Sequence, residues 1–121
     1  MTTPNQNEQL VHRTKAFALR VIRLTEALPR GRTPDIIGKQ LLRAATSVGA
    51  NYRAARRARS PQEFCAKLGI VEEEADECLY WFELLVEAGL VPPPKLAELQ
   101  READEILSMV VASIRTARKK V

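Results

Sequence analysis

Apolar residues recur along this chain at intervals of three and four positions, in four separate segments. That spacing places them on one face of an α-helix, which completes a turn every 3.6 residues. The pattern predicts helices over about residues 9–28, 34–58, 61–88 and 94–118. The apolar stripes are Leu10, Phe17, Val21, Leu24 and Leu28 in the first segment; Ile37, Leu41, Ala44, Val48, Tyr52 and Ala55 in the second; Phe64, Leu68, Val71, Ala75, Cys78, Phe82 and Leu85 in the third; and Leu99, Ala103, Ile106, Val110 and Ile114 in the fourth.

Residues that begin or end helices lie between these segments. Thr33 before Pro34 predicts the start of the second helix, with the hydroxyl as N-cap and the proline at the first helical position. Ser60-Pro61-Gln62-Glu63 has the sequence of a capping box, which predicts the start of the third. Gly89 predicts the end of that helix, because glycine readily adopts the left-handed conformation found there. Gly49, inside the second helix, indicates that a neighbouring helix approaches closely.

The connections between the segments are short, so consecutive helices are expected to lie antiparallel. We therefore predict an all-α fold, an antiparallel up-down-up-down four-helix bundle. The 121 residues are enough for one domain and too few for two ordinary ones, so residues 1–121 are predicted to form a single domain. Residues 1–8 are expected to be a disordered lead-in.

Several features point to a cytoplasmic protein that does not enter a membrane. No stretch approaches the roughly 20 apolar residues of a membrane helix, and the N-terminus lacks the pattern of a secretory signal. Cys65 and Cys78 would lie about 20 Å apart on one helix, too far for a disulfide. They are expected to be structural thiols in a reducing compartment.

Charge is distributed unevenly along the chain. The net charge is +4, but residues 1–60 carry 12 Lys and Arg against 3 Asp and Glu, whereas residues 61–121 carry 7 against 12. On the second helix, Lys39, Arg43, Arg53 and Arg57 are predicted to face away from the apolar stripe, and Arg56 and Arg59 extend this basic group. On the third helix, the predicted outer face is acidic but includes Tyr80 and Leu84.

Three interpretations of these faces remain open. They can be solvated surfaces that keep a small domain soluble. They can join copies of the chain head to tail, in a contact that closes into a ring; the candidate subunit-interface residues are Glu73, Asp76, Glu77, Tyr80 and Leu84. The basic residues can also bind nucleic acid through its phosphates; the candidates are Arg13, Arg20, Arg23, Lys39, Arg43, Arg53, Arg56, Arg57 and Arg59.

The sequence lacks the usual marks of an enzyme, and we expect no cofactor and no metal site. His12 is the only histidine, so a catalytic triad would depend on a residue near a helix end. There is no glycine-rich phosphate loop, and no Glu-x-x-His pair of a di-metal bundle. Glu73 and Glu77 lie one turn apart, a spacing more typical of solvated surface acids than of a magnesium site.

Two further residues have alternative interpretations. Trp81 can stack on a nucleic-acid base, but within Tyr80-Trp81-Phe82 packing in the core or at a subunit interface is favoured. Asn51 can belong to a binding site, but a polar network is favoured, because an amide near the apolar stripe needs hydrogen-bond partners.

Three stretches resemble a known family: residues 40–53, 60–75 and 80–90. They contain an alanine- and serine-rich helix that reaches Ala50-Asn51, and then Ser-x-x-Glu-Phe at residues 60–64. The chain resembles the bacterial four-helix bundle proteins known as 23S rRNA intervening-sequence proteins. One position departs from the family, since Ala54 stands where relatives commonly carry an acid.

The resemblance implies an antiparallel bundle that assembles into a homopentameric ring. The chain is also similar to the accessory proteins of diversity-generating retroelements. Those proteins form rings whose basic surface binds nucleic acid and a reverse transcriptase. We therefore expect a non-enzymatic, ring-forming accessory factor that binds structured RNA or DNA without sequence preference. The alternative is a homo-oligomeric protein-interaction scaffold that binds no nucleic acid.

Overall fold

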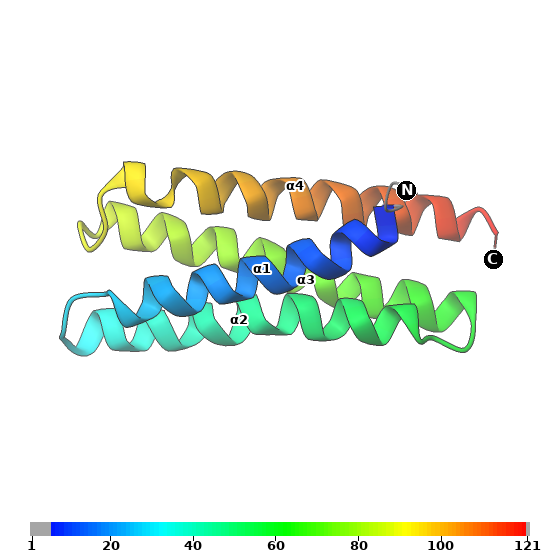
Figure 1. Ribbon diagram of the computed structural model, residues 1–121, viewed down its shortest axis with the longest axis horizontal. Helices are drawn as coiled ribbons and strands as arrows, with labels where there is room; N and C mark the ends of the chain where they lie inside the picture. The colour runs from blue at the N-terminus through cyan, green and yellow to red at the C-terminus, as the bar shows by residue number, and fades with distance from the viewer. Residues whose placement is uncertain (1–5, 121) are drawn as a thin grey trace, which may run out of the picture.

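The computed structural model describes the backbone of residues 6–120 and the side chains of residues 8–120. Over that range the chain forms α1 (Gln6–Glu26), α2 (Arg32–Arg56), α3 (Pro61–Glu87) and α4 (Pro93–Arg118). Figure 1 shows α1 and α3 running in one direction and α2 and α4 in the other. The predicted antiparallel four-helix bundle is confirmed.

The helices pack in a closed cycle. Each helix contacts the next one along the chain, and α1 also contacts α4, over the least extensive of the four interfaces. Figure 1 shows α1 running obliquely across the bundle, from the side of α2 to the side of α4. Because of this oblique course, α1 and α4 meet over only part of their length.

The core is made of the predicted apolar stripes. Every predicted position on α2 and α4 is buried. On α3 only Phe64 is left half-buried, and on α1 only Leu24. Leu28, the predicted last residue of the first helix, is half-buried but lies beyond the end of α1. Phe17 and Phe82 meet edge to face across the core, with ring centroids 6.3 Å apart.

One buried side chain among the described residues is polar, and its hydrogen bond is satisfied. Thr14 occupies a gap in the α1 stripe, and its hydroxyl donates to the backbone oxygen of Leu10 at 2.7 Å. Opposite it lies Gly49, where an added Cβ would lie 3.5 Å from the backbone oxygen of Thr14. The helix that approaches Gly49, as expected from the sequence, is therefore α1.

The predicted start of α2 was wrong. The helix begins at Arg32, its N-cap is Gly31, and Thr33 lies inside the first turn. Gly31 has φ 147°, a backbone conformation open to glycine, so the chain turns there and the helix starts two residues early. Pro34 is tolerated because backbone N–H groups of a first turn have no partner within the helix.

The limits of α3 follow the sequence more closely. Ser60 caps its start, with its hydroxyl oxygen accepting from the backbone N–H of Glu63 at 3.1 Å. The carboxylate of Glu63 accepts from the backbone N–H of Arg59, at 3.2 Å, and not from that of the cap residue. Gly89 follows the end of the helix with φ 74°, as predicted.

The predicted lead-in is partly corrected. It covered residues 1–8, but α1 already includes Gln6, so residues 6–8 are helical. Residues 1–5 lie outside the described range.

Candidate nucleic-acid interface

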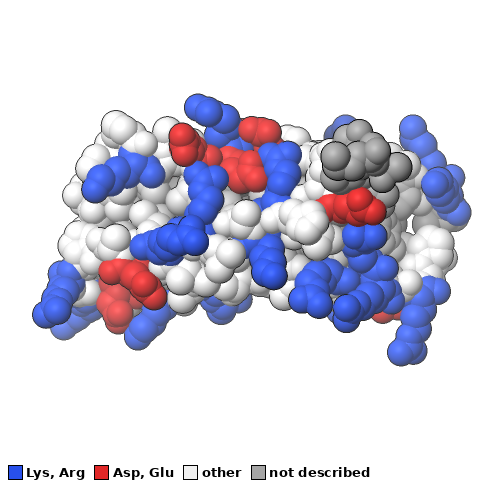
Figure 2. Space-filling model, viewed as in Figure 1, with Lys and Arg blue, Asp and Glu red and all other residues white. Residues whose placement is uncertain are grey.

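Two helix C-termini lie at the same end of the bundle. Figure 1 places the ends of α2 and α4 together at the right, beside the start of α3. Both bring exposed basic residues: Arg53, Arg56, Arg57 and Arg59 from α2 and the turn after it, and Arg115, Arg118, Lys119 and Lys120 from α4 and its last turn. We call these eight residues the basic end. Figure 2 shows blue side chains along both edges of this end.

The position of these residues has a local cause. The backbone carbonyls at a helix C-terminus carry a partial negative charge, which favours Lys and Arg in the last turn. Arg53 and Arg56 occupy the last turn of α2, and Arg115 and Arg118 that of α4. Helix stability thus accounts for each group separately, while the antiparallel fold brings the two groups to one end.

The basic end is not neutralised by acidic side chains of the same chain. Among the described residues, none of its eight side chains lies within ion-pair distance of a carboxylate. The carboxylate of Glu63 is nearby, but it accepts from the backbone N–H of Arg59. The positive charge is therefore available to an anion outside the chain.

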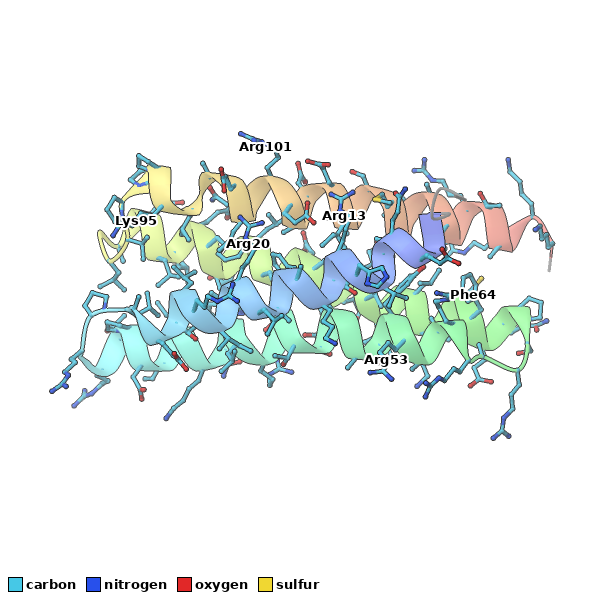
Figure 3. All side chains as sticks on the ribbon, in the orientation of Figure 1. Arg13, Arg20, Arg53, Phe64, Lys95 and Arg101 are labelled. Atoms are coloured by element: carbon cyan, nitrogen blue, oxygen red, sulfur yellow. The ribbon has the colours of Figure 1, made fainter. Side chains whose placement is uncertain are left out.

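A hollow of about 420 Å³ opens at the basic end, and we call it the end hollow. Helices α2, α3 and α4 all contribute to it, together with the turn between α2 and α3. Its lining residues are Ala55, Arg56, Ala58, Ser60, Pro61, Phe64, Ser113, Thr116, Ala117 and Lys120. Figure 3 labels Phe64 at this end, between the ribbon of α4 and those of α2 and α3.

A second depression runs between α1 and α2 from the same end. It has a volume of about 540 Å³, and Lys15, His12 and Arg53 are among its lining residues. A smaller hollow of about 310 Å³ shares Arg53 with it and adds Arg56 and Arg57. The basic end therefore continues into a shallow furrow with basic residues along it.

Two of the predicted nucleic-acid residues, both on α1, form ion pairs with α4. Arg13 donates from Nε to Glu102 at 2.9 Å and also pairs with Glu105, both on α4. The hydrogen bonds that Arg13 donates to Glu102 raise the pKa of Arg13 above its ordinary value. Arg20 pairs with Glu98 of the same helix at 3.3 Å. Figure 3 shows Arg13 and Arg20 between the ribbons of α1 and α4.

The remaining predicted basic residues are divided. Lys39 pairs with Asp35 at 3.1 Å within α2, and Arg43 pairs with Glu77 of α3 at 3.2 Å. Arg23 is exposed near the C-terminus of α1, at the opposite end of the bundle from the basic end. Of the nine predicted residues, the structure therefore brings together Arg53, Arg56, Arg57 and Arg59.

The basic residues of α4 were missed as site candidates. The signal that would have found them is topological, because in an up-down-up-down bundle the C-termini of the second and fourth helices share one end.

The predicted subunit-interface residues lie on the outer side of α3. Glu73 and Asp76 are exposed and have no ion pair among the described residues. Glu77 is engaged within the chain, since it accepts from Arg43 and from the indole N–H of Trp81 at 3.1 Å. Tyr80 is 53% exposed and lies edge to face with Trp81, with ring centroids 5.2 Å apart.

The same side of α3 continues onto α2. Leu84 is half-buried, and Ile36 of α2 is 54% exposed. The ion pair between Arg43 and Glu77 fixes the register of the antiparallel helices α2 and α3. Ile36 lies seven residues before Arg43 and Leu84 seven residues after Glu77, so both lie about two turns from the ion pair towards the same end of the bundle. An apolar patch thus spans both helices, and Ile36 was missed because its own helix stripe does not include it.

Other singled-out residues have ordinary structural roles. The side-chain amide of Asn51 donates to the backbone oxygen and the hydroxyl of Ser47, at 3.0 and 2.8 Å, which agrees with the favoured polar network. Ala54 is half-buried. Cys65 and Cys78 are free thiols, and burial raises the pKa of Cys78 to about 12.

Two features are absent from the described residues. No cluster of three or more His, Cys, Asp or Glu side chains has an arrangement that could hold a metal ion in this part of the chain. No helix within it is long and apolar enough to cross a membrane.

Comparison with known proteins agrees with the fold. A crystal structure of a protein of unknown function from the S23 ribosomal protein family of Bacteroides thetaiotaomicron is similar, with a TM-score of 0.86 and 30% sequence identity. The similarity covers 92% of this chain and 99% of that one. No match was found among curated proteins. Residues 6–112 match the family of 23S rRNA-intervening sequence proteins. The chain therefore belongs to the 23S rRNA-intervening sequence protein family.

Proposed function

We propose that this protein is a non-enzymatic accessory factor that binds structured RNA or DNA through its basic end. The observation that carries the proposal is the meeting of two helix C-termini whose eight basic side chains have no carboxylate partner among the described residues. Such a group neutralises phosphates and releases their counterions.

Binding of this kind has little sequence preference. The residues of the basic end lie in the last turns of two helices and just after them, and not along one helix face of the kind that enters a major groove. Arginine and lysine contacts to phosphates fix position without reading bases.

The proposal assigns no catalytic step to the chain. Cys78 is buried and, with its raised pKa of about 12, remains a thiol, so it is not an activated nucleophile. The two free thiols also support a reducing compartment, which we take to be the cytoplasm.

Salt dependence of binding tests this proposal. We would measure affinity for a structured RNA and for duplex DNA by fluorescence anisotropy, from about 50 to 200 mM salt. The variant with Arg56, Arg57 and Arg59 changed to Gln should bind more weakly, and its slope of log affinity against log salt should be smaller by up to roughly 3.

A control variant removes the same charge elsewhere. Arg30, Lys95 and Arg101 are exposed and outside the basic end, so changing all three to Gln should leave most of the slope intact. Equal losses in both triple variants would mean that net charge alone drives binding. Absence of wild-type binding at about 50 mM salt would refute the proposal and favour a protein-interaction scaffold.

We also propose that copies of the chain assemble into a ring through the apolar patch on α2 and α3. Exposed Ile36 and Tyr80 with half-buried Leu84 supply apolar area, and unpaired Glu73 and Asp76 supply charge for a basic neighbour. A contact between unlike surfaces closes into a ring when the rotation between neighbouring subunits permits it, and the family resemblance indicates five subunits.

Sedimentation velocity tests the assembly. Tyr80→Ser should shift the protein towards monomer, because Tyr80 lies in the patch. Leu19→Ser is the matched control, since Leu19 is 44% exposed on α1, away from the patch. A wild-type monomer at all concentrations, or the same shift in both variants, would rule out this interface.

A further inference from the structure

We propose that the end hollow binds one unpaired base of a bound nucleic acid, stacked on Phe64, with the flanking phosphates at Arg56 and Lys120. This inference rests on the proposed function. It adds a preference for single-stranded or bulged nucleotides over continuous duplex.

The size and lining of the hollow suit a base. Its volume of about 420 Å³ lies near the lower end of the range for small-molecule sites. The alanines at 55, 58 and 117 form apolar walls without filling the space. The one aromatic ring in the lining is that of Phe64.

Phe64 is an exception within its own helix. Every other position of the α3 stripe is buried, whereas Phe64 is half-buried and lines the hollow. An aromatic ring that lines a hollow beside cationic side chains is how sequence-tolerant single-strand binders hold a base. Stacking on such a ring contributes about 1–3 kcal/mol per base.

The charge around the hollow fits the phosphates on either side of that base. Arg56 approaches from α2 and Lys120 from the end of α4. Both are exposed and have no carboxylate partner among the described residues. When a strand places a base in the hollow, a cationic side chain therefore lies on each of two sides of that base.

Three hydroxyl groups line the hollow: that of Ser60 accepts from the backbone N–H of Glu63, and those of Ser113 and Thr116 favour a base with an exocyclic amine. Ser113 donates its proton to the backbone oxygen of Met109 at 3.0 Å, and Thr116 donates to that of Ala112 at 3.0 Å. With their protons used, both oxygens can only accept. They match the exocyclic amine of cytosine and mismatch the carbonyl oxygen that uracil carries at the same ring position.

Base pairing in a duplex competes with binding of the base in the hollow. A base inside a duplex must leave its stack to enter, at a cost of a few kcal/mol, whereas an unpaired base enters without that cost. Duplex binding to the basic end is accordingly independent of Phe64.

The experiment compares oligocytidine, oligouridine and an RNA duplex of the same length, by anisotropy at one salt concentration. Phe64→Leu keeps an apolar side chain and removes the stacking face. We expect it to weaken oligocytidine binding by about 5- to 100-fold and to leave duplex binding within about twofold. Thr116→Val should reduce the preference for oligocytidine over oligouridine, without changing duplex binding.

Each other outcome overturns the inference in a distinct way. Equal losses on single strand and duplex, or no loss on either, would show that Phe64 contacts no base. Competition by polyglutamate that depends on Phe64 would identify an acidic peptide as the occupant. Absence of wild-type binding to all three nucleic acids would overturn the proposed function as well, whereas duplex binding alone would leave that function standing. Circular dichroism of each variant checks that it is folded.

Discussion

Arg13 of α1 holds Glu102 of α4 with two parallel hydrogen bonds. Its Nε lies 2.9 Å from Oε2, and its Nη2 contacts Oε1 of the same carboxylate. The side chains are only 30% and 19% exposed, so water screens the pair less than a surface pair. Since α1 and α4 share the least extensive interface of the bundle, this pair is the main polar link that closes the cycle of helices.

Glu102→Gln should lower the free energy of unfolding by about 1–2 kcal/mol, because a half-buried, charge-assisted pair is lost. Urea denaturation measures the change. Lys39→Gln is the control, since Lys39 and Asp35 are 74% and 64% exposed and such a pair contributes under about 0.5 kcal/mol. Similar losses in both variants would contradict a special contribution from the α1–α4 pair.

The same pair engages Arg13 within the bundle, outside the proposed nucleic-acid surface. Arg13→Gln should lower stability about as much as Glu102→Gln and leave the salt slope of RNA binding unchanged. Anisotropy titrations at temperatures where the variant remains folded measure the slope. A smaller salt slope for Arg13→Gln than for the wild type would show that Arg13 contacts the nucleic acid.

Gly49→Ala should stabilise the protein by about 0.5–1 kcal/mol, because alanine is the better residue inside a helix. The new Cβ would lie 3.5 Å from the oxygen atoms of Thr14, an ordinary contact. Gly69→Ala is the reference, since nothing lies within 4 Å of a Cβ added there. Thermal unfolding measures both variants. A lower melting temperature for Gly49→Ala with a higher one for Gly69→Ala would mean that the packing of α1 against α2 requires glycine at position 49.

Glu74→Gln should stabilise the protein at neutral pH. Burial raises the pKa of Glu74, with Glu77 and Glu73 adding to the effect, and its Oε2 is buried without a hydrogen-bond partner among the described residues. The folded state therefore holds the proton to higher pH than the unfolded state, so wild-type stability falls as pH rises through the unfolded and then the folded pKa.

Chemical denaturation at several pH values measures this effect. The advantage of Glu74→Gln should be largest above the folded pKa and should vanish below about pH 4, where the carboxyl of the unfolded chain is also protonated. Glu87→Gln is the control for the loss of one negative charge, since Glu87 is exposed and is not among the charges that raise the pKa of Glu74. This control should show no comparable trend. An advantage that is constant with pH would exclude the proton linkage.

The two cysteines should differ in reactivity with a thiol reagent. Cys78 is buried and its pKa is raised to about 12, so neither its thiolate nor its sulfur is accessible in the folded protein. Cys65 is half-buried. We expect one thiol to react in native buffer and two in denaturant, and none to react natively in Cys65→Ser. Reaction of both wild-type thiols in native buffer would show that α3 opens readily.

Much of the fold follows from the chain's local pattern. The four apolar stripes, the cap at Ser60 and the turn at Gly89 depend on residues within a few positions of one another, so the sequence is sufficient to place them. The start of α2 was placed wrongly because two local signals competed. Gly31 turned the chain before Thr33 could act as the cap.

The partners of the charged residues depend on packing between helices. The sequence grouped Arg13, Arg20 and Arg43 with the other basic residues, but their positions on the helices bring them against carboxylates of α4 and α3. Distances between residues far apart in the chain decide such pairing, and a residue's own helix does not contain that information.

The sequence by itself determined four amphipathic helices, their approximate limits and the antiparallel bundle, because these follow from short-range periodicity and short connections. Only the tertiary structure decided which cations are free and where they meet. Arg56 and Lys120 are far apart in sequence and line one hollow beside Phe64. Helix lengths and crossing angles set that meeting, and these result from how side chains pack across the whole core.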